Sequence, residues 1–342
     1  MDYRLLQCLE VRGVCPRNMA HEAACKAVAR ARGVHNLLGT GRRDVVLLAI
    51  CIALALKAPN FLTVDNLLNI LRAVSMIGLI AFGMTMVIIA KEIDLSVGSA
   101  VALSTCIVAR LIQAGLPIPI SILLTILIGF GLGVFTGIMR VKFEVPSFIT
   151  TLALFTAERG VALIITKGFP IPITAEWYNF FGGGYVLGVP FPAILFLATF
   201  AIVYFLMKYT VFGGAVYAVG GNDEAARLSG INVGLVRVMV FAITGALAAL
   251  SGVLMSSRIM SGSPTLAQGM ELDVIAAVII GGTSFSGGIG TVRGTLIGIL
   301  FIGVIQNGMT LLNLDANIQY VVRGGLILAA VLVNRLQEIR KT

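Results

Sequence analysis

The stretch of sequence that decides the fold is residues 67–90, which read LLNILRAVSMIGLIAFGMTMVIIA. Arg72 is its one charged residue, and a helix needs about 20 apolar residues to cross the hydrocarbon core of a bilayer. The stretch therefore predicts a transmembrane helix. Similar apolar runs predict further crossings, for a total of about ten. These lie at residues 45–56, 97–114, 118–138, 147–166, 191–207, 236–255, 274–285, 292–312 and 318–333.

The composition of the whole chain agrees with a lipid solvent. Of its 342 residues 58% are hydrophobic and 12% are charged, about half the charged share of a soluble domain. A soluble fold of this length needs more polar surface to cover its core, and disorder, collagen and coiled coil do not fit such a composition. We expect an all-α fold, a polytopic bundle of transmembrane helices.

The basic residues give the orientation. Lys and Arg number 25 against 16 Asp and Glu, a net charge of +9, and they do not alternate with aromatic residues as nucleic-acid contacts do. Their excess in alternate connections places those connections and both termini in the cytoplasm. The connections expected inside carry Arg140, Lys142, Lys208, Arg227, Arg237, Arg293, Arg335, Arg340 and Lys341, and those expected outside carry Lys57, Lys167 and Arg258.

These expectations divide the chain into a cytoplasmic tail (1–44), a transmembrane domain (45–335) and a short cytoplasmic C-terminal tail (336–342). The first tail lacks the compact apolar core of a signal peptide. The five cysteines are too far apart for a metal site, and we expect no metal. There is no Gly-Lys dipeptide for a Walker-type phosphate loop and no Gly-x-Ser-x-Gly nucleophile motif, so we expect no catalytic residue in this chain.

Residues 91–99, KEIDLSVGS, place charges between two strongly apolar runs. Charged side chains near membrane depth are costly and usually face protein or water, which makes Asp94 and Ser96 candidates for a translocation pathway or gate. The same two side chains suit a cap on the helix that follows. From the sequence the two interpretations have equal weight.

Residues 209–233 form the longest connection expected inside, and they contain a short, well-capped helix. Asn222 suits its N-cap, Asp223 and Glu224 its first turn, Arg227 its last turn and Gly230 its end. An exposed helix with an apolar patch is a docking surface for another protein, although a capped loop helix without a partner gives the same pattern. The patch consists of Ala225, Ala226 and Leu228.

Three further features carry polar or small residues. The glycines of residues 281–290, GGTSFSGGIG, cannot continue a stable helix, and irregular backbone at this depth lies against protein or water. Glycines spaced four residues apart allow close helix packing. The remaining polar candidates are Thr150, Thr151, Glu158 and Arg159 within one crossing, Ser286 in the glycine-rich segment, and Glu271 and Asp273 at an outer end, facing solvent or an external partner.

Several long motifs in order resemble those of ribose-type ABC importer permeases. They are EIDLSVGS at residues 92–99, VGGN and AARLSGI at 219–222 and 225–231, ELDVIAA at 271–277, GGT and SGGIGT at 281–283 and 286–291, and YVVRG at 320–324. The resemblance covers roughly residues 45–335. One departure is Lys91-Glu92, where many members of the family have two glycines.

The resemblance implies a multi-pass permease of the bacterial inner membrane that imports a monosaccharide by alternating access. It implies a second permease chain, two cytoplasmic ABC ATPases that use ATP and Mg, and a periplasmic sugar-binding protein. By position it implies that residues 222–228 and Gly230 couple to the ATPase. Asp94, Ser96, Thr150, Thr151 and Ser286 are the implied pathway or gate candidates, and Glu271 and Asp273 the implied contacts of the binding protein.

Other functions remain open from the residues alone. An ion-coupled secondary transporter would use Asp94 or Glu158 as its titrating carboxylate. A membrane enzyme is less well supported, because no crossing contains a histidine or a recognisable nucleophile. An importer could also carry another small polar solute, such as an amino acid or a nucleoside.

Overall fold

A computed structural model describes residue 45 and residues 47–339. The chain divides into two compact units, residues 1–49 and 50–342, and the second holds the features discussed below, apart from the first three residues of a helix at Leu47–Lys57. The expected N-terminal tail (1–44) and the last residues of the C-terminal tail, including Arg340 and Lys341, lie outside the described residues.

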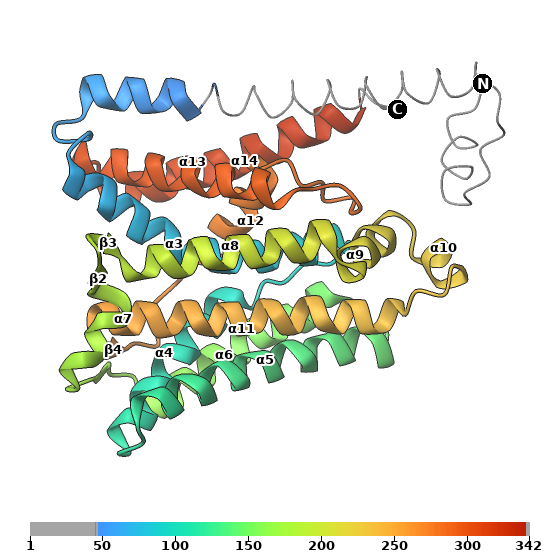
Figure 1. Ribbon diagram of the computed structural model, residues 1–342, viewed down its shortest axis with the longest axis horizontal. Coiled ribbons are helices and arrows are strands. Elements are labelled where there is room, and N and C mark those ends of the chain that lie inside the picture. Colours follow the sequence, from blue (N-terminus) through green and yellow to red (C-terminus); the bar gives the residue numbers. More distant parts are fainter. Residues whose placement is uncertain (1–44, 46, 340–342) are drawn as a thin grey trace. The chain divides into compact units, whose positions relative to one another are not determined.

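The second unit is built of helices, as the sequence predicts. After an apolar helix at Leu47–Lys57, these are α3 (Val64–Ile89), α4 (Val97–Gln113), α5 (Ile118–Lys142), α6 (Ser147–Thr166), α7 (Phe180–Gly183), α8 (Phe191–Tyr209), α9 (Val211–Gly221), α10 (Asp223–Leu228), α11 (Val233–Ile259), α12 (Met270–Ile280), α13 (Val292–Leu311) and α14 (Ala316–Ile339). In Figure 1 the long helices α5, α8, α11 and α13 run along the same axis of the molecule.

Helix α3 lies at the centre of this unit. Thr63 caps it by accepting a hydrogen bond from the amide of Asn66, and every residue from 78 to 90 is buried. Of the 18 residues in its most apolar stretch 83% are buried, whereas the corresponding stretches are 28% buried in α5, 22% in α6 and 33% in α8. A helix that is apolar all round and yet exposed fits lipid as its solvent, so α5, α6 and α8 form the lipid-facing side.

Small residues allow α5 and α11 to pack closely, as the glycine spacing predicts. A methyl group added at Gly129 would lie 2.5 Å from the Cβ of Ala249, and one at Gly137 would lie 2.5 Å from the Cα of Val238. Gly133 packs in the same way against the backbone of Phe241. Backbones that approach this closely gain the van der Waals contact that holds helices together in lipid.

Short strands and turns cover the C-terminal end of α11. Strand β1 (Ile171–Pro172) pairs antiparallel with β4 (Ser261–Gly262), and β2 (Tyr185–Val186) pairs with β3 (Val189–Pro190). Between them a 3-10 helix, η1 (Glu176–Asn179), carries the buried Tyr178. Its hydroxyl donates to the carbonyl of Val253 at 3.0 Å and fixes this cover to α11.

The helices follow the predicted crossings except in two places. The run expected at 274–285 becomes α12, which ends at Ile280 because glycines follow it. The connection at 209–233 contains α9 before the expected short helix, since Thr210 caps an apolar run there and accepts a hydrogen bond from the Gly213 amide. In the described part of the chain, six helices are long and apolar enough to span a membrane: α3, α5, α6, α8, α11 and α13.

Candidate functional site

The loop between α3 and α4 lies inside the protein and carries two buried carboxylates, Glu92 and Asp94, each 4% exposed. One carboxylate oxygen of Asp94 accepts hydrogen bonds from the Ser96 amide at 2.9 Å and from the Ser96 hydroxyl at 2.6 Å. Ser96 occupies the N-cap position of α4, but its side chain makes no capping hydrogen bond. Asp94 therefore orders the loop. Of the two interpretations that the sequence left open, capping of α4 is contradicted for the Ser96 side chain, whereas Asp94 binds the amide of the N-cap residue itself.

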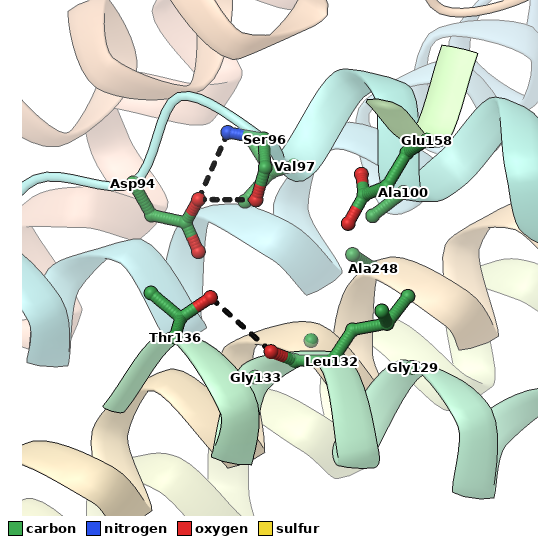
Figure 2. Close-up of a pocket in the computed structure, with 11 residues that line it drawn as sticks. Asp94, Ser96, Val97, Ala100, Gly129, Leu132, Gly133, Thr136, Glu158 and Ala248 are labelled. Carbon is green, nitrogen blue, oxygen red and sulfur yellow. Dashed lines mark hydrogen bonds between the residues drawn. The ribbon is translucent and has the colours of Figure 1, made fainter. Parts of the chain in front are cut away.

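A third buried carboxylate, that of Glu158 in α6, faces the same region as Asp94. It is 3% exposed and accepts a hydrogen bond from the hydroxyl of Ser99 at 2.7 Å. Figure 2 shows Asp94 and Glu158 on one side of a small cavity, with Thr136 and Leu132 of α5 on the other. The cavity is lined by Asp94, Ser96, Val97, Ala100, Gly129, Leu132, Gly133, Thr136, Glu158, Gly245 and Ala248.

The cavity is closed to a solute of sugar size in this conformation. Its volume is about 10 Å³, enough for roughly one water molecule and far below the several hundred Å³ of a ligand pocket. Two carboxylates beside so small a space, in a chain with little charge, are costly unless the helices rearrange or a polar group enters. The geometry identifies this cluster as a closed polar site between α4, α5, α6 and α11.

Arg159, next to Glu158, points elsewhere and holds a different segment. Its guanidinium donates to the backbone carbonyls of Pro264 at 2.6 Å and Leu266 at 2.8 Å. This contact fixes the segment between β4 and α12 against α6. Because adjacent residues of a helix point in different directions, Glu158 and Arg159 have separate partners.

Glu271 and Asp273 in the first turn of α12 are buried, at 8% and 4% exposed, so the expectation that they face solvent is wrong. Asp273 forms an ion pair with Arg323 of α14 at 3.1 Å and accepts a hydrogen bond from Gln306 of α13 at 3.2 Å. The carboxylate of Glu271 packs against Gly98, where a methyl group would overlap it. Because α12 is surrounded by α3, α13 and α14, its first turn points into protein.

The other pathway candidates do not line this cavity. Thr151 is fully buried and donates to the carbonyl of Phe148 at 3.3 Å, and Thr150 is also buried in the first turn of α6. Ser286 is exposed in the glycine-rich turn, where its amide donates to the hydroxyl of Ser284 at 3.1 Å. Of the candidates, the structure brings together Asp94 and Ser96 and adds Glu158 to them.

The short helix predicted from Asn222 to Gly230 is present as α10. The side chain of Asn222 accepts a hydrogen bond from the amide of Ala225 at 3.0 Å, and Gly230 ends the turn with a φ of 85°. Leu228 is 85% exposed, whereas Ala226 is buried against the rest of the chain. In Figure 1, α10 projects from the end of the bundle beyond α9.

A chain of ion pairs joins α10 to the buried loop. Arg237 of α11 contacts Asp223 of α10 at 3.1 Å and Glu92 of the loop at 2.9 Å, and Arg140 of α5 contacts Glu92 at 2.8 Å. The guanidinium of Arg237 lowers the pKa of Asp223 by hydrogen bonding to its carboxylate. The sequence reasoning counted both arginines only as orientation signals. A buried acid at position 92, between apolar runs, is the signal that could have indicated basic partners.

The glycine-rich turn packs beside the same loop. The amide of Gly288 donates to the carbonyl of Ile89 at 2.9 Å, and the hydroxyl of Tyr217 in α9 donates to the carbonyl of Gly290 at 2.9 Å. The end of α3, the α9–α10 segment and the start of α13 thus meet at one end of the bundle. A continuous set of contacts therefore connects α10 with the loop that carries Asp94.

The comparisons with known proteins agree with this arrangement. A family model described as "Branched-chain amino acid transport system / permease component" matches residues 66–331. The chain belongs to this permease family. The resemblance found in its motifs is confirmed. The chain is the permease component of a transport system and a multi-pass protein of the bacterial inner membrane.

Curated relatives of this permease are similar over almost their whole length. The ribose import permease protein of Bacillus subtilis is 46% identical over 84% of this chain and 90% of its own length. The ribose import permease protein of Haemophilus influenzae is 43% identical over 88% of this chain and 94% of its own length. The L-arabinose ABC transporter permease protein of Azospirillum brasilense is 38% identical over 92% and 93%. No solved structure matches the chain.

Proposed function

We propose that this permease is the membrane subunit of an ATP-driven importer and carries a monosaccharide, a pentose or a hexose, across the inner membrane. The similarity to permeases named for ribose and L-arabinose, over most of both chains, is the observation that carries the substrate class. The ion-coupled alternative has no such support. ATP and Mg are used by a separate cytoplasmic ABC ATPase, and a periplasmic sugar-binding protein delivers the solute.

The same proposal includes about ten crossings, with both termini in the cytoplasm. Its support is the gathering of basic side chains at the end of the bundle where α10 projects. Arg140 and Arg237 meet there at Glu92, and Lys208 and Arg293 meet at Tyr204. This end is the cytoplasmic one by the excess of positive charge, and a second copy of the permease completes the transporter.

Residues 222–228 and Gly230 form the surface on which the ATPase docks. The exposed Leu228 offers an apolar contact, and the cap at Asn222 helps to keep so short a helix formed. When the ATPases close, α10 moves with them, and the Asp223–Arg237–Glu92 chain carries the displacement into the loop at Asp94. The polar cluster of Asp94, Ser96 and Glu158 then opens as part of the gate, and Thr150, Thr151 and Ser286 are further pathway candidates.

Transport into proteoliposomes tests the energy source. The complete importer should take up its sugar only with ATP and the ATPase subunit, and dissipation of the proton gradient should leave the initial rate unchanged. Uptake that collapses with the gradient, or uptake by the permease alone against a concentration gradient, would contradict the proposal.

Replacement of residues 222–227 by a Gly/Ser segment tests the docking surface. We expect insertion into the membrane to be unaffected, because α10 packs little against the bundle, and sugar-stimulated ATP hydrolysis to be abolished. A Gly/Ser replacement of residues 186–188, in the β2–β3 turn at the other end, is the matched control. Normal stimulation after the first replacement would overturn the docking role.

A further inference from the structure

Two cations, Lys208 and Arg293, meet at one tyrosine ring where α8 packs against α13. The ammonium of Lys208, in the last turn of α8, donates to the hydroxyl of Tyr204 at 2.9 Å and lies 5.0 Å from the ring centre of Tyr209. The guanidinium of Arg293, in the first turn of α13, lies 4.8 Å from the ring centre of Tyr204. Lys208 and Arg293 are exposed and Tyr204 is partly exposed.

Among the side chains that the structure describes, no carboxylate lies within ion-pair distance of either cation. This differs from Arg140, Arg237 and Arg323, each of which has an acidic partner. Arg293 also stands in the first turn of its helix, where the helix dipole disfavours a positive charge. Lys208 and Arg293 thus contact one tyrosine ring, and the position of Arg293 is unfavourable for its helix. Two cations in this arrangement suit the binding of an anion.

The surroundings identify the kind of anion. On α8, Ile202 at 66% and Phe205 at 60% exposed precede Lys208, and Tyr209 at 61% exposed follows it. Such a surface faces lipid tails in a membrane-spanning helix. Tyrosines and a lysine at its end belong to the interfacial region, where aromatic rings and snorkelling cations lie at the level of the headgroups. An anion at this level, next to exposed apolar side chains, is the phosphate of a lipid.

We propose that Lys208 and Arg293, ordered by Tyr204, bind the headgroup phosphate of an anionic phospholipid. The guanidinium can pair with two phosphate oxygens, and the ammonium contributes a point charge from the other helix. The lipid bridges the end of α8 to the start of α13, beside the segment that leads into α10. This site requires neither the sugar nor the ATPase, so its test is separate from that of the transport function.

Native mass spectrometry of the purified full-length permease in detergent tests the site directly. The probes are phosphatidylglycerol and phosphatidylcholine of the same chain length, added to wild type and to K208Q/R293Q. We expect wild type to prefer phosphatidylglycerol, and the variant to lose on the order of tenfold in affinity for it with unchanged binding of phosphatidylcholine. The matched control, K142Q/K167Q, removes two exposed lysines elsewhere and should keep the preference.

A second pair of variants tests the tyrosine. Y204F keeps the ring and should keep most of the phosphatidylglycerol preference, whereas Y204L removes the surface on which both cations rest and should lose it. The thermal unfolding temperature in detergent shows whether each variant is folded. We expect it to change little, because these side chains are not part of the core.

Three results would overturn the proposal. One is equal binding of phosphatidylglycerol by wild type and K208Q/R293Q. Another is displacement of the bound lipid by millimolar inorganic phosphate, which would make the site one for a soluble anion. The third is a variant that keeps its lipid preference but no longer binds the ATPase subunit, which would assign the two cations to an acidic protein surface.

Discussion

Glu92 and Asp94 stand two residues apart on one loop, yet their surroundings differ completely. Glu92 lies between two arginines from α5 and α11, and one of these reaches α10 through Asp223. Among the described residues, Asp94 has hydrogen bonds from Ser96 alone and faces a small cavity shared with Glu158. The loop therefore joins a side whose acid is paired with two arginines to a side whose acid has no basic partner in the described part of the chain. The first suits transmission of movement, and the second suits a gate.

The largest expected effect is that of removing the carboxylate of Glu92. E92A leaves Arg140 and Arg237 without their shared carboxylate in a largely buried position, and we expect unfolding in detergent to become easier by about 3 kcal/mol. E176A, at an exposed glutamate, is the control and should change the free energy of unfolding by less than about 0.5 kcal/mol. Equal effects of the two variants would remove the contrast between Glu92 and an ordinary surface acid.

The next effect concerns the other carboxylate. D94A leaves the amide and hydroxyl of Ser96 without their acceptor, at an expected cost of about 2 kcal/mol of unfolding free energy. D94N keeps one acceptor oxygen but replaces the acidic group by an amide, so we expect a cost below about 1 kcal/mol but a large loss of sugar uptake in proteoliposomes. If D94N transports normally, the acidic group at this position does not serve the gate.

A smaller effect is the pH dependence of the ion pair between Asp223 and Arg237. The hydrogen bond from Arg237 lowers the pKa of Asp223, so the folded state favours the ionised form. The contribution to stability is therefore present above the ordinary pKa of an aspartate and is lost as the pH falls through the lowered value. Because Asp223 is half exposed, we expect well under 1 kcal/mol. The difference in unfolding free energy between wild type and D223N should shrink toward zero from neutral to acidic pH, and a constant difference would contradict the link.

The last effect has the opposite sign and lies where the loop leaves α3. Lys91 has a φ of 64°, in the left-handed region, where a residue other than glycine loses about 1 kcal/mol. We expect K91G to change the free energy of unfolding by at most about 1 kcal/mol and in the stabilising direction, while K91A, which keeps a Cβ atom, brings no gain. This strain fits the position at which many members of the family have glycine.

Much of the fold was predictable, because apolar runs, prolines and glycine spacing act locally. The start and end of α6 were predicted to the residue, and close packing at Gly129 follows from the glycine spacing, whereas its partner α11 does not. The cap at Asn222 and the end at Gly230 were predictable for the same reason. The run at 274–285 was predicted too far along the chain, since α12 ends at Ile280, and the sequence does not show at which glycine the helix unwinds.

The candidate site was only partly predictable, since its partners come from helices far apart in the sequence. The contacts of Glu92 with Arg140 and Arg237, and of Asp273 with Arg323, depend on which helices pack together. For the same reason Glu271 and Asp273 were expected at the surface and lie inside. The motif containing Asp94 pointed to the correct loop, but the role of Asp94 in ordering Ser96 required the structure.

The most direct test of the central claim, that α10 meets an ATPase in the cytoplasm, is the side of the membrane on which Leu228 lies. Single cysteines are introduced into a chain without other cysteines at Leu228, 85% exposed on α10, and at Leu187, 99% exposed in the β2–β3 turn. A membrane-impermeant thiol reagent should label L187C, but not L228C, in cells whose outer membrane is permeabilised, and should label L228C in inverted inner-membrane vesicles. Labelling of L228C from outside would contradict the account.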